Sequence, residues 1–216
     1  MTPLGSRAAG RGALWPCLTA LIALPGCVSG LNSKIPAQQS YVLQSAPVPA
    51  PAASVPGASP SAASLKVLRP SPAPGLEREG IAVMRAGRRL DFYTDARWVA
   101  RAPAMLQALV IDSLRNAGRF AAVESDAEPF AAQYVLGLEL QHFEAVYDQA
   151  GPPSIRVAFV ATLGRSSDRV VIASFTAHSE VQADADRMQA VIAAFDQATG
   201  EALAQLAANV APPASN

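Results

Sequence analysis

The sequence predicts an α+β domain in which two amphipathic helices pack on one face of a mostly antiparallel β-sheet. Three runs in the second half of the chain alternate apolar and polar residues, which is typical of half-buried strands. Two other segments repeat apolar residues every three or four positions, which is typical of helices that cover a sheet. Together these observations predict two layers around one core.

Length and composition are sufficient for one such domain. Of the 216 residues, 50% are hydrophobic and 16% are charged. The formal net charge is zero, and removal of residues 1–26 takes away Arg7 and Arg11, leaving 15 basic against 17 acidic residues, a net charge of −2. Because no basic stripe is present either, nucleic acid is not predicted as a partner.

Residues 1–26 are expected to be a lipoprotein signal peptide. Arg7 and Arg11 give the start of the chain a positive charge without any acid. The apolar stretch at 13–24 is too short to span about 30 Å of hydrocarbon as a helix, as expected of a signal sequence.

A lipid anchor is predicted at Cys27. The leader ends in Leu24-Pro25-Gly26-Cys27, which resembles the lipobox of bacterial lipoproteins, although Pro25 departs from the usual small residue. Buried acyl chains contribute about 0.8 kcal/mol per CH₂, so two or three chains anchor stably. Val28, rather than Asp, favours the outer membrane, with the domain on its periplasmic side. The alternative is an ordinary secretory leader with a cysteine nearby by chance.

Residues 27–64 are expected to form a lipidated tether. It contains a short strand-like run at 41–43, which is also compatible with an edge strand of the domain. Residues 45–64 are nearly all Pro, Ala, Ser and Val, a composition typical of an extended segment without its own core. This segment is interpreted either as a spacer or as a loop insertion without a function.

The folded domain is expected over residues 65–210, and its first half contains short strands and one helix. A strand is predicted at 65–68, and a hairpin at 81–85 and 89–94. A helix is predicted at 102–117, because a proline is typical of the first turn of a helix and a glycine is typical of the position after its last turn. Its apolar face and boundary residues are Met105, Leu106, Leu109, Val110, Leu114, Pro103 and Gly118.

The second half contains three longer strands and a closing helix. The alternation of Leu136, Leu138 and Leu140 reverses phase at His142, which predicts a β-bulge there. Antiparallel strands are predicted at 155–163 and 171–181, and a helix at 185–209. The apolar face of this helix consists of Met188, Val191, Ile192, Phe195, Ala202, Leu203 and Leu206.

Nothing in the sequence predicts an enzyme, a cofactor or a metal. A Gly-x-Ser-x-Gly motif and a Gly-rich phosphate loop are absent, and acylation would consume the thiol of Cys27. His142 and His178 are candidate metal ligands with Glu139, Glu144 or Glu180. The predicted strand at 155–163 separates the two histidines, so histidines that face solvent are the simpler interpretation.

The remaining charged residues and Trp98 have two interpretations each. The turn at 77–79 and the group Arg85, Arg88 and Arg89 are either solvated turn charges or part of a partner surface. Trp98 is either a core residue or an exposed anchor, and the core is favoured. Spacing alone supports no catalytic carboxylate pair among Asp91, Asp95, Glu124, Asp126 and Glu128.

Several motifs, in this order, resemble the ABC-type transport auxiliary lipoprotein component family, which includes the paraquat-inducible protein C-like lipoproteins. The resemblance covers roughly residues 41–207, and it departs from the family at 77–80, where an Asp and then an Arg are expected. The motifs are Tyr41-Val42-Leu43, Leu65-Lys66-Val67, Pro74-Gly75-Leu76, Ile81-Ala82-Val83-Met84-Arg85, the aromatic run from Leu90 to Trp98, the helix from Pro103, Gly118-Arg119-Phe120 and Ala194-Phe195-Asp196.

This resemblance implies a non-catalytic partner of a transporter that contains a permease, an ATPase and a mammalian-cell-entry (MCE) domain protein. Such systems move phospholipids or other hydrophobic molecules between the inner and outer membranes. The implied partners are the MCE-domain protein and the outer membrane, through Cys27, and a homo-oligomer is compatible with the sequence. The alternatives are a lipid-binding carrier with an apolar cavity and a lipoprotein that braces an outer-membrane barrel.

Overall fold

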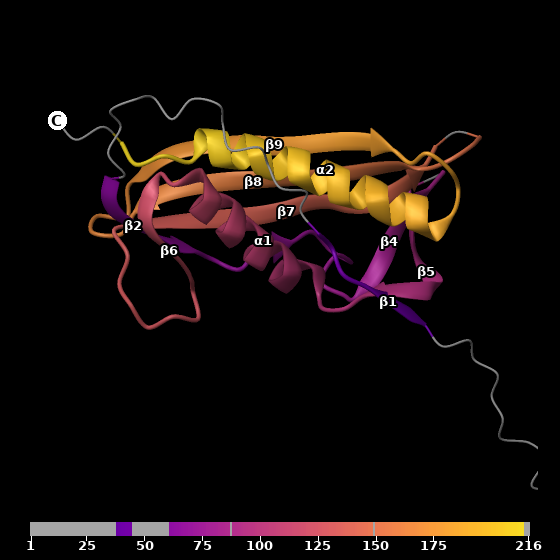
Figure 1. Ribbon diagram of the computed structural model, residues 1–216, viewed down its shortest axis with the longest axis horizontal. Helices are drawn as coiled ribbons and strands as arrows, with labels where there is room; N and C mark the ends of the chain where they lie inside the picture. Colours follow the sequence, from indigo (N-terminus) through magenta and orange to yellow (C-terminus); the bar gives the residue numbers. More distant parts are fainter. Residues whose placement is uncertain (1–37, 45–60, 87, 149, 214–216) are drawn as a thin grey trace, which may run out of the picture. The chain divides into compact units, whose positions relative to one another are not determined.

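One sheet of nine strands, with two helices against it, makes up the part of the chain that the computed structural model describes (Figure 1). The described residues are 38–44, 61–86, 88–148 and 150–213, all within the unit Pro36–Asn216. The helices are α1 (Ala102–Ala117) and α2 (Met188–Asn209). The strands are β1 (Gln39–Tyr41), β2 (Ser61–Val67), β3 (Ser71–Pro72), β4 (Gly80–Arg85), β5 (Arg89–Trp98), β6 (Phe120–Ser125), β7 (Tyr134–Tyr147), β8 (Ser154–Arg165) and β9 (Val171–Gln182).

Strand β7 lies at the centre of the sheet because both of its edges are paired. On one edge it pairs antiparallel with β8 along nearly its whole length, and β8 pairs antiparallel with β9. The other edge is shared by three short strands, all parallel to β7: β2 at 134–136, β3 at 139–140 and β4 at 144–147. The sheet is therefore mixed, and mostly antiparallel by paired residues, which confirms the predicted fold class.

The predicted β-bulge in β7 is confirmed. Leu140 pairs with Phe159 and His142 pairs with Ala158, so Gln141 is the extra residue on β7. Because the bulge shifts the alternation by one residue, the apolar side chains before and after it all reach the buried face. These buried residues are Leu136, Leu138, Leu140, Phe143 and Ala145.

Both helices lie on one face of the sheet, as predicted (Figure 1). Helix α2 packs on β8 and β9, and α1 packs on β6 and β2 and against α2. Helix α1 has the predicted bounds, and Gly118 ends it in the left-handed conformation with φ 65°. Helix α2 begins at Met188, later than the predicted 185, because Asp186 is held outside the helix by a hydrogen bond from the Tyr147 hydroxyl.

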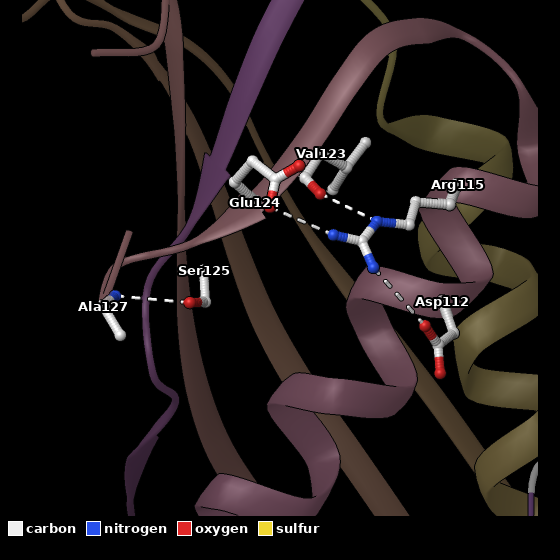
Figure 2. Close-up of polar contacts among 6 residues, drawn as sticks. All are labelled: Asp112, Arg115, Val123, Glu124, Ser125 and Ala127. Carbon is white, nitrogen blue, oxygen red and sulfur yellow. Dashed lines mark hydrogen bonds and ion pairs between the residues drawn. The ribbon is translucent and has the colours of Figure 1, made fainter. Parts of the chain in front are cut away.

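Arginine 115 ties α1 to the edge strand β6 (Figure 2). Its Nε donates to the carbonyl oxygen of Val123 at 2.9 Å, and Nη2 donates to Glu124 at 3.1 Å. Asp112, one turn earlier in α1, lies 3.9 Å from the same guanidinium group. This side chain therefore links the helix to a backbone acceptor of a strand that pairs only with β2.

Three aromatic rings from separate elements fill the core between the sheet and α2. The Trp98 ring from β5 lies 5.5 Å from Phe143 of β7 and 5.2 Å from Phe195 of α2, between ring centroids. Phe143 and Phe195 are 5.1 Å apart. Since Trp98 is fully buried, the core interpretation of this residue is confirmed.

The sequence pattern did not predict β3 and β6. In β6 the buried residues Phe120 and Val123 are three positions apart, which does not match the alternation of a strand. Strand β3 has only two residues, one of them Pro72, so no pattern exists to detect it. Strand β2 also begins earlier than predicted, at Ser61, and β5 extends to Trp98.

The strand predicted at 41–43 lies instead at Gln39–Tyr41, and Val42 and Leu43 follow it in the folded body. Strand β1 pairs in parallel with β5, and Leu43 is only 3% exposed. The N–H of Gln44 donates to Asp196 of α2 at 2.8 Å. The predicted spacer therefore follows a docked segment along the chain and leads into β2, although residues 45–60 lie outside the described residues.

Replacement of Trp98 by alanine is expected to lower the free energy of unfolding by about 3–5 kcal/mol, because it leaves a cavity among Phe143 and Phe195. Urea denaturation measures the loss. The matched control is Val99→Ala at the neighbouring exposed position, which should change stability by no more than about 0.5 kcal/mol. Equal effects of the two substitutions would contradict the assignment of Trp98 to the core.

Candidate functional site

The face of β7, β8 and β9 that points away from the helices is covered by no helix among the described residues. The cross-strand register aligns its residues in rows across the three strands. The middle of this face carries small and β-branched side chains, together with the exposed Glu139. We call it the bare sheet face, and its central rows are Gly137, Thr162 and Ser174, then Glu139, Val160 and Thr176.

A charged row closes one end of the bare sheet face. Glu144, Arg156 and Glu180 are aligned across β7, β8 and β9, and Arg156 Nε lies 3.5 Å from Glu180 Oε2. His142 Nδ1 lies 2.8 Å from Glu144 Oε1. Arg156 and Glu180 therefore present charges of both signs, which favours orientation of a partner over nonspecific attraction, whereas Glu144 is buried.

Glu144 also completes the bulge. Its side chain is only 4% exposed, and its Oε2 accepts the N–H of Phe143 at 2.7 Å. This donor lies between the residues of β7 that pair with β3 and those that pair with β4. Because an unpaired buried N–H is costly, the carboxylate stabilises the point where β7 changes neighbours.

The two histidines do not share a metal site. His142 and His178 both align with Ala158, one on each neighbouring strand, so β8 separates them as predicted. Two strand spacings separate their backbones by about 10 Å, and His142 Nδ1 contacts Glu144 instead. Throughout the described ranges, no three His, Cys, Asp or Glu residues are grouped so that they could hold a metal.

Two edges of the sheet are closed by side chains of the helices. Gln205 of α2 bonds to both backbone groups of His178 in β9: its Oε1 accepts the N–H at 3.1 Å, and its Nε2 donates to the carbonyl at 2.8 Å. On β6, Nε of Arg115 donates a hydrogen bond to the carbonyl oxygen of Val123 (Figure 2). These contacts hinder the addition of a foreign strand at either edge.

The remaining residues singled out in the sequence are dispersed. Arg85 and Arg89 both pair with Asp91 at the tip of the β4–β5 hairpin, and Arg78 lies over the ring of Phe92. Other predicted acidic residues serve structural contacts: Glu124 pairs with Arg115, and Asp126 accepts a hydrogen bond from Gln107. Cys27 and the whole predicted signal peptide lie outside the described residues.

Sequence reasoning missed a chain of hydrogen bonds through two tyrosines. The hydroxyl of Tyr147 donates to Asp186 at 2.6 Å, and the hydroxyl of Tyr93 lies 2.9 Å from that of Tyr147. Burial raises the pKa of the Tyr93 phenol, and burial together with Asp186 raises the pKa of Tyr147. Both phenols therefore stay protonated and tie the hairpin, β7 and the start of α2 together. No sequence signal links residues so far apart.

Aromatic side chains fill the core between the sheet and α2. The rings of Trp98, Phe143 and Phe195 occupy the space under α2. A surface depression of about 490 Å³ lies instead at the opposite end of β7, lined by residues 132–134 and 165–167, which are largely polar. Within the described part of the chain, no helix is both long enough and apolar enough to cross a membrane.

These features define a packed α+β domain with one bare sheet face and a helix side-chain contact on each of the strands β6 and β9. The sequence profile of the ABC-type transport auxiliary lipoprotein component family matches residues 41–211. The chain therefore belongs to this family, whose role is auxiliary to transport, and the resemblance identified from the motifs is confirmed.

Solved structures agree with this assignment. A crystal structure of a Xanthomonas campestris protein from the family named DUF330 is 27% identical to the chain, with a TM-score of 0.64, and the match covers 79% of this chain and 90% of that one. A second crystal structure, of an uncharacterised protein, is 14% identical with a TM-score of 0.59, covers 81% and 97%, and shows the fold alone. A search of curated proteins finds no match.

Replacement of Asp196 by asparagine is expected to stabilise the protein at neutral pH. Partial burial raises the pKa of this carboxyl, so folding disfavours its ionised form. The cost is fully present above the folded-state pKa and disappears as the pH falls below the unfolded-state pKa. Asparagine keeps an oxygen that accepts the N–H of Gln44.

Urea denaturation over a pH series measures this difference. The advantage of Asp196→Asn over the unsubstituted chain should shrink as the carboxyl becomes protonated in acid. Asp184→Asn, at an exposed position on the segment before α2, is the control and should show no such trend. An advantage that grows on acidification would contradict the direction of the pKa shift.

Proposed function

We propose that the protein is an outer-membrane lipoprotein on the periplasmic side that serves an ABC-type transport system containing an MCE-domain protein, a permease and an ATPase. The system would carry lipids or other hydrophobic compounds between the two membranes. The observation that carries the proposal is the family match over residues 41–211, which covers nearly all of the chain after the leader. The role within the system is that of a non-catalytic adaptor.

The proposed anchor rests on the leader and its lipobox. A thiol acylated at Cys27 would leave the described body outside the bilayer and attached through residues 28–37. Val28 after the cysteine supports sorting to the outer membrane. An adaptor in this position needs an anchor at one end and a surface for the transporter, and the chain supplies candidates for both.

The bare sheet face is the proposed contact with the MCE-domain protein. Its central rows carry no helix among the described elements, and the Arg156 and Glu180 side chains beside them supply charges that would set the orientation of a partner. The packed aromatic core under α2 favours an adaptor over a lipid-binding carrier, because a carrier would need an apolar cavity of several hundred Å³.

The anchor is tested by replacing Cys27 with alanine. The unsubstituted product, labelled with a radioactive fatty acid, is expected to carry label and to enter the detergent phase on phase separation. Cys27→Ala should carry no label and remain in the aqueous phase, because its acyl acceptor is gone. An unsubstituted product that kept residues 1–26, or stayed in the aqueous phase, would refute the anchor.

The partner is tested by co-purification from detergent-solubilised envelopes. The MCE-domain protein should be recovered with the unsubstituted chain, and recovery should fall with Thr176→Arg, because a long charged side chain would interrupt the bare sheet face. Gln189→Arg adds the same charge on α2 and should leave recovery unchanged.

Circular dichroism establishes that both variants are folded. Crosslinking to an outer-membrane barrel and not to an MCE-domain protein would select the bracing role. Phospholipid retained by the purified chain in native mass spectrometry would select the carrier. Recovery that is unaffected by Thr176→Arg would move the contact away from the bare sheet face.

A further inference from the structure

The docked segment at 38–44 creates a second exposed surface, beside the point where the chain enters the body. In the parallel β1–β5 pair, Tyr41 aligns with Trp98 on the core side, and Ser40 aligns with Arg97 on the outer side. Val42 and Val99 are the next outer positions along the two segments, and they are 57% and 55% exposed. The N–H of Val99 donates to the carbonyl of Tyr41, which holds the two segments together.

We propose that this outer surface, made of Ser40, Val42, Arg97, Val99 and Arg101, rests on the phospholipid surface that holds the lipid anchor. The proposal deepens the proposed function, since it rests on lipidation of Cys27. It adds the orientation of the body: the β1–β5 end contacts the bilayer, and the bare sheet face stays free for a protein partner.

The length of chain before the docked segment favours a bilayer as the occupant. Only residues 28–37 separate Cys27 from Gln38. Even fully extended, this connection can reach no more than about 40 Å. The Pro-rich segment at 45–60 adds nothing to that reach, because it follows β1 in the chain. The entry point of the body therefore stays within about 40 Å of the anchored cysteine.

The docked segment is joined firmly enough to transmit this constraint. Leu43 is buried in the main core cluster, and the N–H of Gln44 bonds to Asp196 of α2. Gln38 Nε2 donates to the carbonyl of Thr94 in β5 at 2.7 Å. The position of Gln38 is thus fixed relative to the outer surface beside it.

The chemistry of the outer surface suits a phospholipid headgroup layer. Two exposed valines offer apolar contact at the level of the headgroups, and arginines lie beside them. Arg97 donates to Ser40 and pairs with Glu79, whereas Arg101, exposed at the start of α1, has no ion-pair partner among the described residues. A free guanidinium beside apolar side chains can bind the phosphate of a lipid.

The other exposed valines provide a matched control. Val170 and Val171, at the turn between β8 and β9, are 50% and 60% exposed, similar to Val42 and Val99. Val171 aligns through Gly164 with Val135 at the start of β7, whereas β4 and β5 lie at the end of β7. Strands β4, β7 and β8 therefore lie between the two pairs in the sheet.

The test uses the full mature, lipidated chain in vesicles of phosphatidylethanolamine and phosphatidylglycerol. Single substitutions Val42→Cys, Val99→Cys, Val170→Cys and Val171→Cys are each labelled with an environment-sensitive fluorophore, since the thiol of Cys27 is acylated. Headgroup spin-labelled lipid then quenches probes that touch the bilayer. We expect a blue shift and a loss of emission at 42 and 99, and neither at 170 and 171.

Charge reversal gives a second readout. Arg101→Glu should weaken quenching at position 99, with the larger loss at low salt, because screening reduces the attraction between arginine and lipid phosphate. Arg169→Glu in the β8–β9 turn is the matched control, because it makes the same charge reversal at a site away from the proposed contact. It should have no effect on quenching at position 99.

Vesicle flotation separates failure of this inference from failure of the proposed function. A chain that does not float lacks the anchor, which refutes the proposed lipoprotein. A chain that floats without quenching at 42 and 99, or with equal quenching at all four positions, overturns the proposed orientation. Protection of positions 42 and 99 only after an MCE-domain protein is added would also overturn it, because the occupant would then be protein.

Discussion

The structure depends on one long strand that must be paired along both edges while it keeps its apolar side chains on one face. Strand β7 meets this constraint with β8 on one side and three short parallel strands on the other. The bulge at Gln141 allows the change from β3 to β4 without loss of the buried face, and the Glu144 carboxylate satisfies the backbone donor exposed there. The core, the hairpin and the helices are all arranged around this strand.

The same constraint explains why the domain presents a surface rather than a cavity. Helix α2 packs on β8 and β9 and α1 on β6 and β2, on one face of the sheet, and the aromatic rings of Trp98, Phe143 and Phe195 fill the core under α2. The opposite face keeps small, β-branched and charged residues, and Gln205 and Arg115 close the neighbouring edges. Since strand addition is hindered, the bare sheet face is the natural contact for an auxiliary component of a transporter.

The docking of residues 38–44 changes how the beginning of the chain is understood. From composition, the residues between the leader and Leu65 resemble an extended tether, because Pro, Ala and Ser are frequent in them. The pairing of β1 with β5 and the burial of Leu43 instead show that residues 38–44 are bound to the folded body. This docked segment lies in the chain between the stretches 28–37 and 45–60. A force on the amino-terminal side of the segment would therefore act on the sheet and on Asp196 of α2. Only the residues before Gln38 limit the distance between the lipid anchor and the body.

The sequence alone determined what depends on neighbours in the chain: the alternation of β7–β9, the bulge near His142, the bounds of α1 and the family motifs. These features were predictable because side-chain periodicity and helix boundaries are local. Only the tertiary structure decided the parallel partners of β7, the short strands β3 and β6, and the chain from Tyr93 to Asp186. It also decided the candidate site, because the rows of the bare sheet face and the caps by Gln205 and Glu144 depend on register. Register follows from packing between residues distant in the chain, which no local pattern encodes.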